Sequence, residues 1–261
     1  PKALPPVVLP DASPPVPTPP LPAPPLPPLP PVLAPAVAVP PVANFLQDND
    51  DLLFYLDKGI DWEPVVKLTE RGFVDEDGPR DVAEAIELYR DIANLVGTFA
   101  AEEIAPRAKA IEAVGFRVEN GEAVAPPELD VLFDKIRELD LHRLNLPREL
   151  GGTNCPLMLY FIDCELMARA DVSVMAHHGF HGGMALAALV FSIREGSTHF
   201  EGTRIASTRF AEAIEEMASG QAWGCMDITE PDAGSDMARL RAVGEQDEHG
   251  NWFVTGQKIF I

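Results

Sequence analysis

The stretch Trp223–Asp236 has the residue types and the spacing best suited to bind a ligand; its sequence is Trp-Gly-Cys-Met-Asp-Ile-Thr-Glu-Pro-Asp-Ala-Gly-Ser-Asp. Strand-like residues end at Thr229, Pro231 fixes a turn, and Gly234 allows a backbone φ that other residues resist. Such a turn presents consecutive N–H groups and two hydroxyls to a flat ligand that accepts hydrogen bonds. The pattern alone indicates a ligand loop at a strand end. Composition slightly favours the competing interpretation, an ordinary hairpin corner.

Three histidines, His177, His178 and His181, cluster on one predicted helix. His177 and His181 have the i, i+4 spacing that can bind zinc. No carboxylate or thiol lies nearby at metal-ligand spacing, and the helix is apolar, so we expect no metal site and assign these side chains to polar packing. The glycines form neither GxGxxG nor GxxxxGK[ST], which disfavours a Rossmann or P-loop site.

Three cysteines, Cys155, Cys164 and Cys225, form no CxxC pair and are too few for a disulfide framework. We expect them to be reduced and buried, which suits the cytoplasm. No base has the spacing that would make Cys225 a nucleophile.

Charge and proline divide the 261 residues into two parts. Residues 1–43 contain 19 of the 27 prolines and no net charge, so the formal charge of −21 lies on residues 44–261. The prolines exclude helix and sheet and favour a disordered segment of extended polyproline conformation. Its PxxP patterns suit a proline-binding module, but a semi-rigid linker without an evolved role is the favoured interpretation. The acidic part argues against a nucleic-acid or acidic-membrane binder.

The order of elements predicts an α+β protein, with a helical domain over 44–220 followed by the beginning of a β-domain over 221–261. Asp81 and Glu84 form a capping-box pattern before the apolar spacing of one helical face. Further helices are expected over 129–139, 157–170, 173–192 and 203–219; the two middle ones are apolar nearly all round and should lie inside a bundle. Short strands are expected over 222–229, 240–245, 252–255 and 258–261, with a turn at 247–251.

The ends of the chain predict a fragment. The first residue is proline rather than methionine, and the last residues lie inside an apolar strand whose backbone groups need a partner. The longest apolar run, 182–193, has twelve residues, well short of the ~20 that span a bilayer. We therefore expect a buried helix and no stable membrane span.

Several ordered motifs resemble the acyl-CoA dehydrogenase family over residues 44–261. Thr229-Glu-Pro-x-x-Gly-Ser-Asp236, followed by Gly256–Ile261, resembles the family's middle-domain signature. Upstream segments agree in order: Asn49–Glu63, Pro147–Gly152, Glu165–Ser173 and Thr203–Gly220. The first of these resembles the extended N-terminus of the larger bacterial members.

The resemblance implies an N-terminal helical domain, a β-barrel middle domain and a C-terminal four-helix bundle, with FAD as cofactor. It further implies oxidation of an acyl-CoA to the trans-2-enoyl-CoA, with hydride transfer to flavin N5, electrons passed to an electron-transfer flavoprotein, and a homodimer or homotetramer. By the same resemblance the cofactor contacts are Met226, Asp227, Ile228, Thr229, Gly234, Ser235, Phe260 and Ile261, and Ser235 also contacts substrate. Phe260 stands where the family has tryptophan, and this keeps an aromatic face but loses an N–H.

The family's catalytic glutamate lies in the C-terminal bundle, so we expect no catalytic residue here and no activity from this fragment alone. Glu165 and Glu230 do not match its position. An acyl-CoA oxidase of the same fold is the first alternative, and no residue separates the two. A non-catalytic proline-rich interaction fragment is the second.

Overall fold

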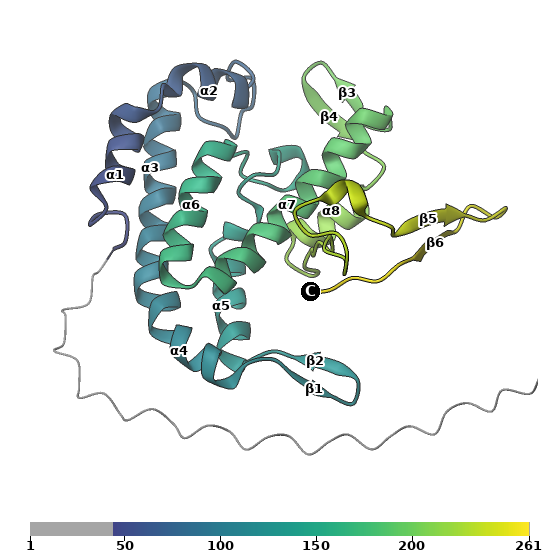
Figure 1. Cartoon of the computed structure of the whole chain (residues 1–261). Helices are drawn as coiled ribbons and strands as arrows, with labels where there is room; N and C mark the ends of the chain where they lie inside the picture. Colours follow the sequence, from purple (N-terminus) through teal and green to yellow (C-terminus); the bar gives the residue numbers. More distant parts are fainter. Residues whose placement is uncertain (1–43, 261) are drawn as a thin grey trace, which may run out of the picture. The chain divides into compact units, whose positions relative to one another are not determined.

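The computed structural model describes residues 44–260, which form helices with two short hairpins between them and a third hairpin after them (Figure 1). The proline tract 1–43 lies outside the described residues, and so does the conformation predicted for it. Ile261, with its predicted flavin contact, also lies outside them.

The described residues confirm the predicted α+β class, with helices first and the β5–β6 hairpin last. The α-helices are α1 (Asp50–Phe54), α2 (Trp62–Thr69), α3 (Val82–Phe99), α4 (Ala105–Val114), α5 (Pro127–Glu138), α6 (Leu157–Ala170), α7 (Val172–Glu195) and α8 (Ala211–Ala218). Shorter helical segments are the π-helical η1 (Tyr55–Gly59) and η2 (Ala100–Ile104) and the 3-10 turns η3 (Leu141–Arg143), η4 (Arg148–Leu150) and η5 (Met237–Arg239). The strands are β1 (Arg117–Glu119), β2 (Glu122–Val124), β3 (His199–Glu201), β4 (Arg204–Ser207), β5 (Val243–Gln246) and β6 (Trp252–Thr255), paired as three antiparallel hairpins.

The start of α3 confirms the predicted cap. The Asp81 carboxylate accepts a hydrogen bond from the Glu84 N–H at 2.9 Å, and the helix begins at the next residue, Val82. The Glu84 carboxylate returns to the N–H of Arg80 at 2.7 Å rather than to that of Asp81. Two free N–H groups at the helix start are therefore hydrogen-bonded, as in a capping box. The difference is that Glu84 bonds the residue before the N-cap instead of the N-cap itself.

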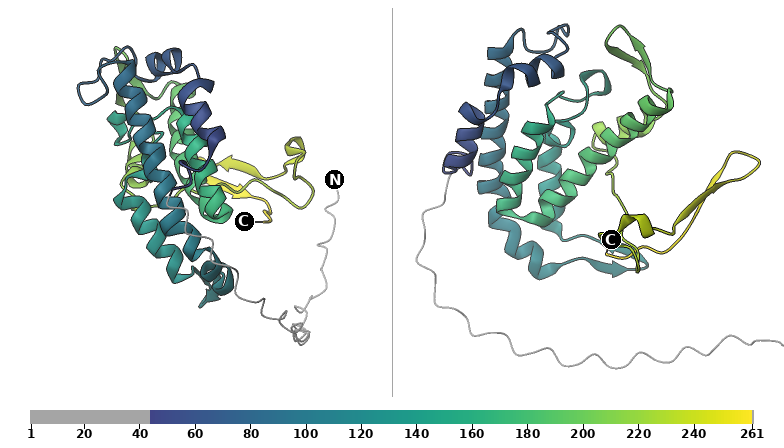
Figure 2. Two further views of the ribbon diagram at one scale, coloured as in Figure 1. Left: turned by 90° about the vertical axis from the view of Figure 1, so that its left-hand side faces the viewer. Right: turned by 45° about the horizontal axis from the view of Figure 1, so that its top comes forward.

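The main core lies around α3 and α6, which run side by side (Figures 1 and 2). Its fully buried side chains include Ala93 and Val96 from α3 and Leu159, Leu166 and Met167 from α6. A second, smaller cluster joins α7 to α8 and consists of Leu146, Ala185, Leu189, Ile214 and Ala218. These clusters fix the helices from which the candidate site is built.

The prediction that α6 and α7 are buried all round is wrong. Phe161 on α6 is 63% exposed and Phe191 on α7 is 58% exposed, so the described elements do not cover these helices on every side. Within residues 44–260, α7 is the one helix whose length and hydropathy would suffice to cross a membrane. That is weak support for a membrane location, since core helices often share both properties.

The single helix predicted over 203–219 is also wrong. Strands β3 and β4 form a hairpin over 199–207, with Gly202 at φ 64° in its turn, and α8 occupies only 211–218. The helical spacing does not continue back over residues 204–207, because these residues pair with β3 as strand β4. The predicted glycine at the helix end is confirmed, because Gly220 has φ 71° and donates its N–H to the Met217 carbonyl at 3.1 Å.

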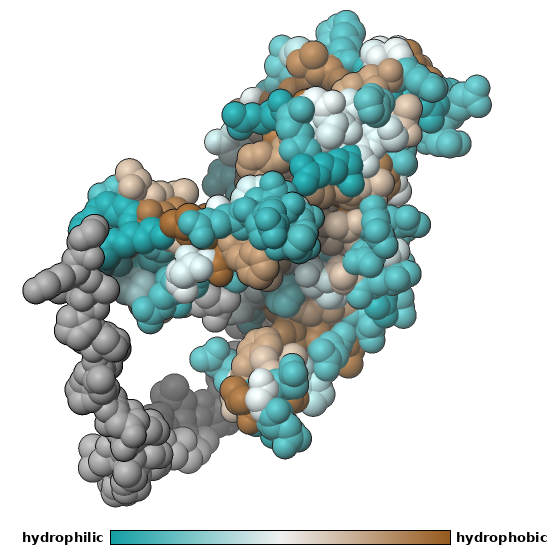
Figure 3. Space-filling view, turned by 90° about the vertical axis from the view of Figure 1, so that its right-hand side faces the viewer, coloured by the Kyte–Doolittle hydropathy of each residue, from teal (hydrophilic) through white to brown (hydrophobic). Residues whose placement is uncertain are grey.

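Two of the four strands predicted after residue 220 are confirmed in position. Strand β6 matches the predicted 252–255 and β5 overlaps 240–245, and the Asp247 carboxylate closes the predicted turn by accepting the N–H groups of His249 and Asn251. Residues 222–229 and 258–260 are irregular instead, because neither segment forms a ladder with another described strand. Hydrophobic residues are visible at the surface on the side shown in Figure 3. Strand β6 also exposes three large side chains, Trp252, Phe253 and Val254.

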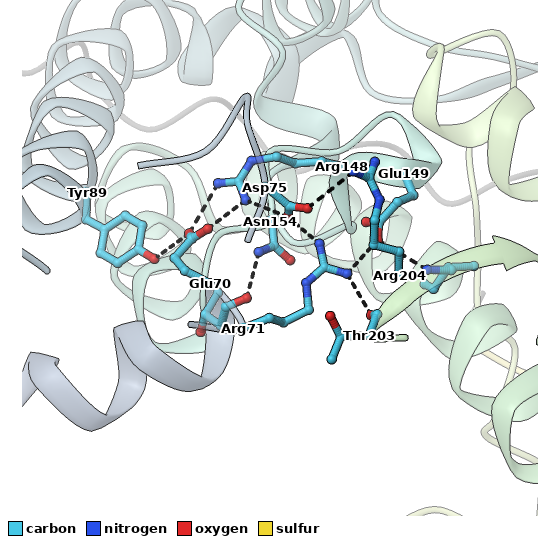
Figure 4. Close-up of polar contacts among 11 residues, drawn as sticks. Glu70, Arg71, Asp75, Tyr89, Arg148, Glu149, Asn154, Thr203 and Arg204 are labelled. Carbon is cyan, nitrogen blue, oxygen red and sulfur yellow. Dashed lines mark hydrogen bonds and ion pairs between the residues drawn. The ribbon is translucent and has the colours of Figure 1, made fainter. Parts of the chain in front are cut away.

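A buried ion pair connects the end of α2 to the turn at η4 (Figure 4). The Glu70 carboxylate, 1% exposed, lies 2.6 Å from Nη1 of Arg148, which is 16% exposed. It also accepts a hydrogen bond from the Tyr89 hydroxyl of α3 at 3.2 Å. Burial and the neighbouring carboxylate raise the pKa of Tyr89, so its hydroxyl remains a donor.

A second arginine extends this network to the β3–β4 hairpin (Figure 4). Arg71 pairs with Asp75 and with Glu149, and it donates to the Thr203 carbonyl at 2.9 Å. The Glu149 carboxylate also accepts the N–H of Ile205 at 3.2 Å. Three segments that are distant in sequence are thus held by charge-assisted hydrogen bonds in a partly buried setting.

We predict that Arg148→Met destabilises the chain by about 3–5 kcal/mol, because it leaves the buried Glu70 carboxylate without its counter-charge. Urea unfolding of both forms measures this loss. Arg80→Met is the matched control. Arg80 is 87% exposed in its pair with Glu84, so its replacement should change the stability little. Equal losses in the two variants would show that burial of the Glu70 pair is unimportant.

Candidate functional site

The predicted cofactor loop, 226–235, contains a tight turn at the end of an irregular segment. Glu230 and Ala233 exchange both backbone hydrogen bonds, at 3.0 and 3.1 Å, around Pro231. No atom lies within 4 Å of the position that a Cβ would take on Gly234, and Ser235 is exposed. The structure therefore confirms a turn here, but not the special backbone conformation predicted for Gly234, whose φ is not positive. The cofactor and substrate contacts assigned to Gly234 and Ser235 remain predictions.

Glu230 holds this turn to two later segments. Its carboxylate accepts the N–H groups of Arg241 at 2.7 Å and Ala242 at 2.9 Å, and it lies 2.9 Å from Nζ of Lys258. Hydrogen bonds from the Arg241 N–H, the Lys258 ammonium and the Ala242 N–H lower the pKa of Glu230 to about 2. Sequence analysis placed Glu230 in the turn but gave no sign of this role, because its partners lie 11 to 28 residues away.

The same contacts bring both predicted cofactor segments together. Lys258 donates from Nζ to the Ile228 carbonyl at 3.0 Å, and the Ile259 N–H donates to the Thr229 carbonyl at 2.9 Å. Ile228 and Thr229 therefore lie directly beside residues 258–259. The next residue, Phe260, has φ 61° and is 90% exposed.

A pocket of about 200 Å³ lies where these segments meet α7. Three predicted cofactor residues, Met226, Asp227 and Phe260, line it together with His177, Phe180, Gly224 and Cys225. Four other predicted cofactor residues do not line it: Ile228, Thr229, Gly234 and Ser235. Because ligand sites usually measure about 300–1,000 Å³, this pocket accounts for only one wall of a site for a large cofactor.

The chemistry of this wall is compatible with a flavin ring. In the described part of the chain, the N–H groups of Met226, Asp227, Ile228 and Thr229 have no hydrogen-bond acceptor. A flavin ring has hydrogen-bond acceptors and an apolar face, which these donors and the neighbouring Phe260 could contact. The donor set is thus suited to an uncharged, flat, acceptor-rich ligand.

The three α7 histidines have different environments. His177 is exposed at the pocket, whereas His178 and His181 are buried. Burial, with further repulsion from nearby imidazoles, lowers the pKa of His178 to about 3 and that of His181 to about 4. Both rings are therefore neutral at physiological pH. Among residues 44–260 no three His, Cys, Asp or Glu side chains are grouped so as to hold a metal ion.

The expectation that all three cysteines are buried is wrong for Cys225. All three thiols are free, but only Cys155 is fully buried; Cys164 is half-buried and Cys225 is exposed. Cys225 lies on the irregular segment at the pocket, where the predicted strand would have covered it.

Two larger cavities lie away from the predicted cofactor loop, and a third, of about 400 Å³, lies at its Glu230 turn without contact to the predicted cofactor residues. One of about 470 Å³ lies beside α8, and one of about 520 Å³ lies near the η4 turn. Arg148 and Glu149, which line one each, already belong to the buried ion-pair network. The small pocket at residues 224–227 is the better candidate, because the backbone N–H groups beside it have no acceptor among the described residues.

The helical part matches a known family. Residues 87–195 match the family model described as "Acyl-CoA dehydrogenase, N-terminal domain". The chain is 26% identical over 211 residues to 3-methylmercaptopropionyl-CoA dehydrogenase of Ruegeria pomeroyi, covering 81% of this chain and 32% of that protein. It is 28% identical over 165 residues to mitochondrial isovaleryl-CoA dehydrogenase of Oryza sativa, covering 63% and 35%. The chain thus spans about a third of the length of these relatives.

Solved structures agree with the fold. Butyryl-CoA dehydrogenase of Megasphaera elsdenii aligns with a TM-score of 0.51 and 17% identity, covering 67% of this chain and 40% of that one. A structure described as the electron transferring flavoprotein of Acidaminococcus fermentans aligns with a TM-score of 0.50 and 18% identity, covering 66% and 39%. At this identity the likeness concerns the fold alone.

We predict that Glu230→Gln destabilises the chain at neutral pH and has little effect near pH 2. A carboxyl whose folded pKa is lowered from 4.5 to about 2 stabilises the fold above the higher value, and this contribution is lost as the pH falls through the lower one. Denaturation midpoints of both forms across this range measure the effect. Glu245→Gln, on the exposed strand β5, should match the wild type throughout. A Glu230→Gln deficit that stays constant with pH would show that the charge is not responsible.

We predict that Cys225 reacts rapidly with a maleimide in the folded chain, whereas Cys155 reacts only after unfolding. Cys225 is exposed, and burial raises the pKa of Cys155, so its reactive thiolate is scarce. Mass spectrometry of peptides after timed labelling locates the modified residue, and Cys225→Ser should remove the fast phase. Protection of Cys225 equal to that of Cys155 would contradict the exposed geometry.

Proposed function

We propose that the chain belongs to the acyl-CoA dehydrogenase family and that the protein of which it forms part oxidises an acyl-CoA thioester between Cα and Cβ. The observation that carries this proposal is the row of unused N–H donors at 226–229 beside the pocket wall. When bound there, FAD would accept the hydride that leaves the substrate.

The proposed role of residues 44–260 is binding and orientation. Thr229 is assigned a hydroxyl hydrogen bond to the flavin ring and Ile228 a backbone contact, while Met226 and Asp227 border the ring edge. Phe260 is assigned the packing contact on the ring face, which Ile261 would continue. Ser235, exposed on the turn, is free to reach the coenzyme A portion of the substrate.

The general base is proposed to come from outside these residues. The Glu230 carboxylate is fully engaged by two N–H groups and an ammonium, so it is a poor proton acceptor. Glu165 is exposed on α6 and lines a different groove, with Tyr55 and Met158. Removing a proton next to the thioester carbonyl also needs donors for the developing enolate-like charge, in a site closed to water.

The partners are proposed by family resemblance, and the compartment is proposed from the free cysteines. Electrons would pass to an electron-transfer flavoprotein, the complete protein would form a homodimer or homotetramer, and the location would be cytoplasmic. The net charge of −21 makes local arginine or lysine contacts necessary for the coenzyme A phosphates.

The decisive experiment adds acyl-CoA substrates of different chain length to the purified whole protein without oxygen. Bleaching of the flavin absorbance is the expected result, and an electron-transfer flavoprotein should restore it faster than oxygen does. Faster recovery with oxygen would indicate an oxidase instead. A whole protein that contains no flavin would overturn the proposal.

We predict that Thr229→Val in the whole protein weakens flavin binding about two- to tenfold, the range expected for one lost hydrogen bond of about 0.5–1.5 kcal/mol. Fluorescence titration of the apoprotein with FAD measures it. Thr255→Val, on the exposed strand β6, is the matched control and should bind FAD as the wild type does. Equal affinity in all three forms would remove Thr229 from the site.

A further inference from the structure

His181 connects the end of α8 to the segment that leads into the cofactor loop. Its Nδ1 accepts a hydrogen bond from the Gly224 N–H at 3.1 Å, and its Nε2 lies 3.1 Å from the Met217 carbonyl oxygen. The backbone N–H can only donate and the carbonyl can only accept. The ring must therefore be neutral, with its proton on Nε2.

Gly224 is confined from its other side as well. A Cβ at this position would lie 2.7 Å from Cβ of Met184 and 3.1 Å from Sδ of Met217, so only glycine fits without displacement. The preceding residue, Trp223, packs against His181 with ring centroids 4.3 Å apart and against Phe133 at 4.5 Å. The positions of Trp223 and Gly224, which precede the other residues of the pocket wall, are therefore fixed by packing.

We propose that His181 is a positioning residue, which holds Gly224 and thereby sets the place of the N–H groups at 226–229. The inference rests on the proposed function, because the importance of that placement comes from the flavin contact. His181 itself does not line the pocket, whereas Gly224 does.

The surroundings of His181 keep its ring neutral. Its ring lies 5.9 Å from that of His142 in η3, and His177 and His178 flank it on α7. The last turn of α8 contributes the carbonyls of Met217 and of Ala218, the second bonded to His142, and Arg137 of α5 lies beside Gly220. A second proton on Nδ1 would face the Gly224 N–H and break the contact.

Two substitutions separate the two hydrogen bonds. The Oδ1 of His181→Asn can take the place of Nδ1 and accept from Gly224, whereas the Nε2 of His181→Gln can take the place of the ring Nε2 and donate to Met217. Both remove the imidazole, so a purely structural loss would affect them alike. The inference predicts that only the glutamine variant releases the loop.

The first measurement uses this chain without flavin. Hydrogen exchange at the Gly224 amide, followed by NMR, should be about tenfold faster in His181→Gln than in the wild type, the size expected for one lost hydrogen bond to a buried group. In His181→Asn it should stay within about threefold of the wild type by the same reasoning. Equal exchange in both variants, whether fast or slow, overturns the inference.

The second measurement uses the whole protein and FAD titration. His181→Gln should bind FAD about tenfold more weakly, and His181→Asn should retain most of the affinity. Equal FAD affinity in the two variants would contradict a positioning role toward the cofactor. If the wild type binds no FAD while the exchange difference is present, the proposed function fails and the hold on Gly224 stands.

Discussion

The ion pair between Glu70 and Arg148 is the constraint on which the arrangement of the helical part depends. It fixes the η4 turn against the end of α2, and the neighbouring Arg71–Glu149 pair joins that turn to the β3–β4 hairpin. Helix α8 packs against the same turn, and its carboxyl end meets His142 and His181. Buried charge is expensive unless it is paired, so this set of contacts specifies one arrangement of segments rather than adding bulk stability.

The candidate site is held at its two ends by side chains that differ in charge. His181 meets Gly224 with a neutral ring acceptor, whereas Glu230 gathers two N–H groups and the Lys258 ammonium with a full negative charge. Residues 225–229 between them form no ladder with a described strand, and their N–H donors remain available. A segment held at its two ends and by its Ile228 and Thr229 carbonyls can present its N–H donors to a ligand without competition from a sheet.

Sequence patterns predicted what depends on neighbours along the chain. The cap at Asp81, the bounds of α6 and the Gly220 stop all follow from local signals. The same reasoning failed at 203–219 and 222–229, where pairing with another segment, or its absence among the described strands, decides the conformation. The exposure of Cys225 and the contacts of Glu230 likewise depend on residues far away in sequence. Recognition of the loop motif therefore located the candidate site, but not the side chains that hold it.

The distribution of the core along the chain has a consequence for synthesis. Every fully buried member of the two hydrophobic clusters lies at or before Ala218, whereas all eight residues of β5 and β6 are exposed. The helical part can therefore complete its core on the ribosome while the later strands are still being translated. Its mostly local helical contacts favour rapid closure. The cofactor segment would then emerge beside a helical part that is already folded, in which Nδ1 of His181 can accept the Gly224 N–H.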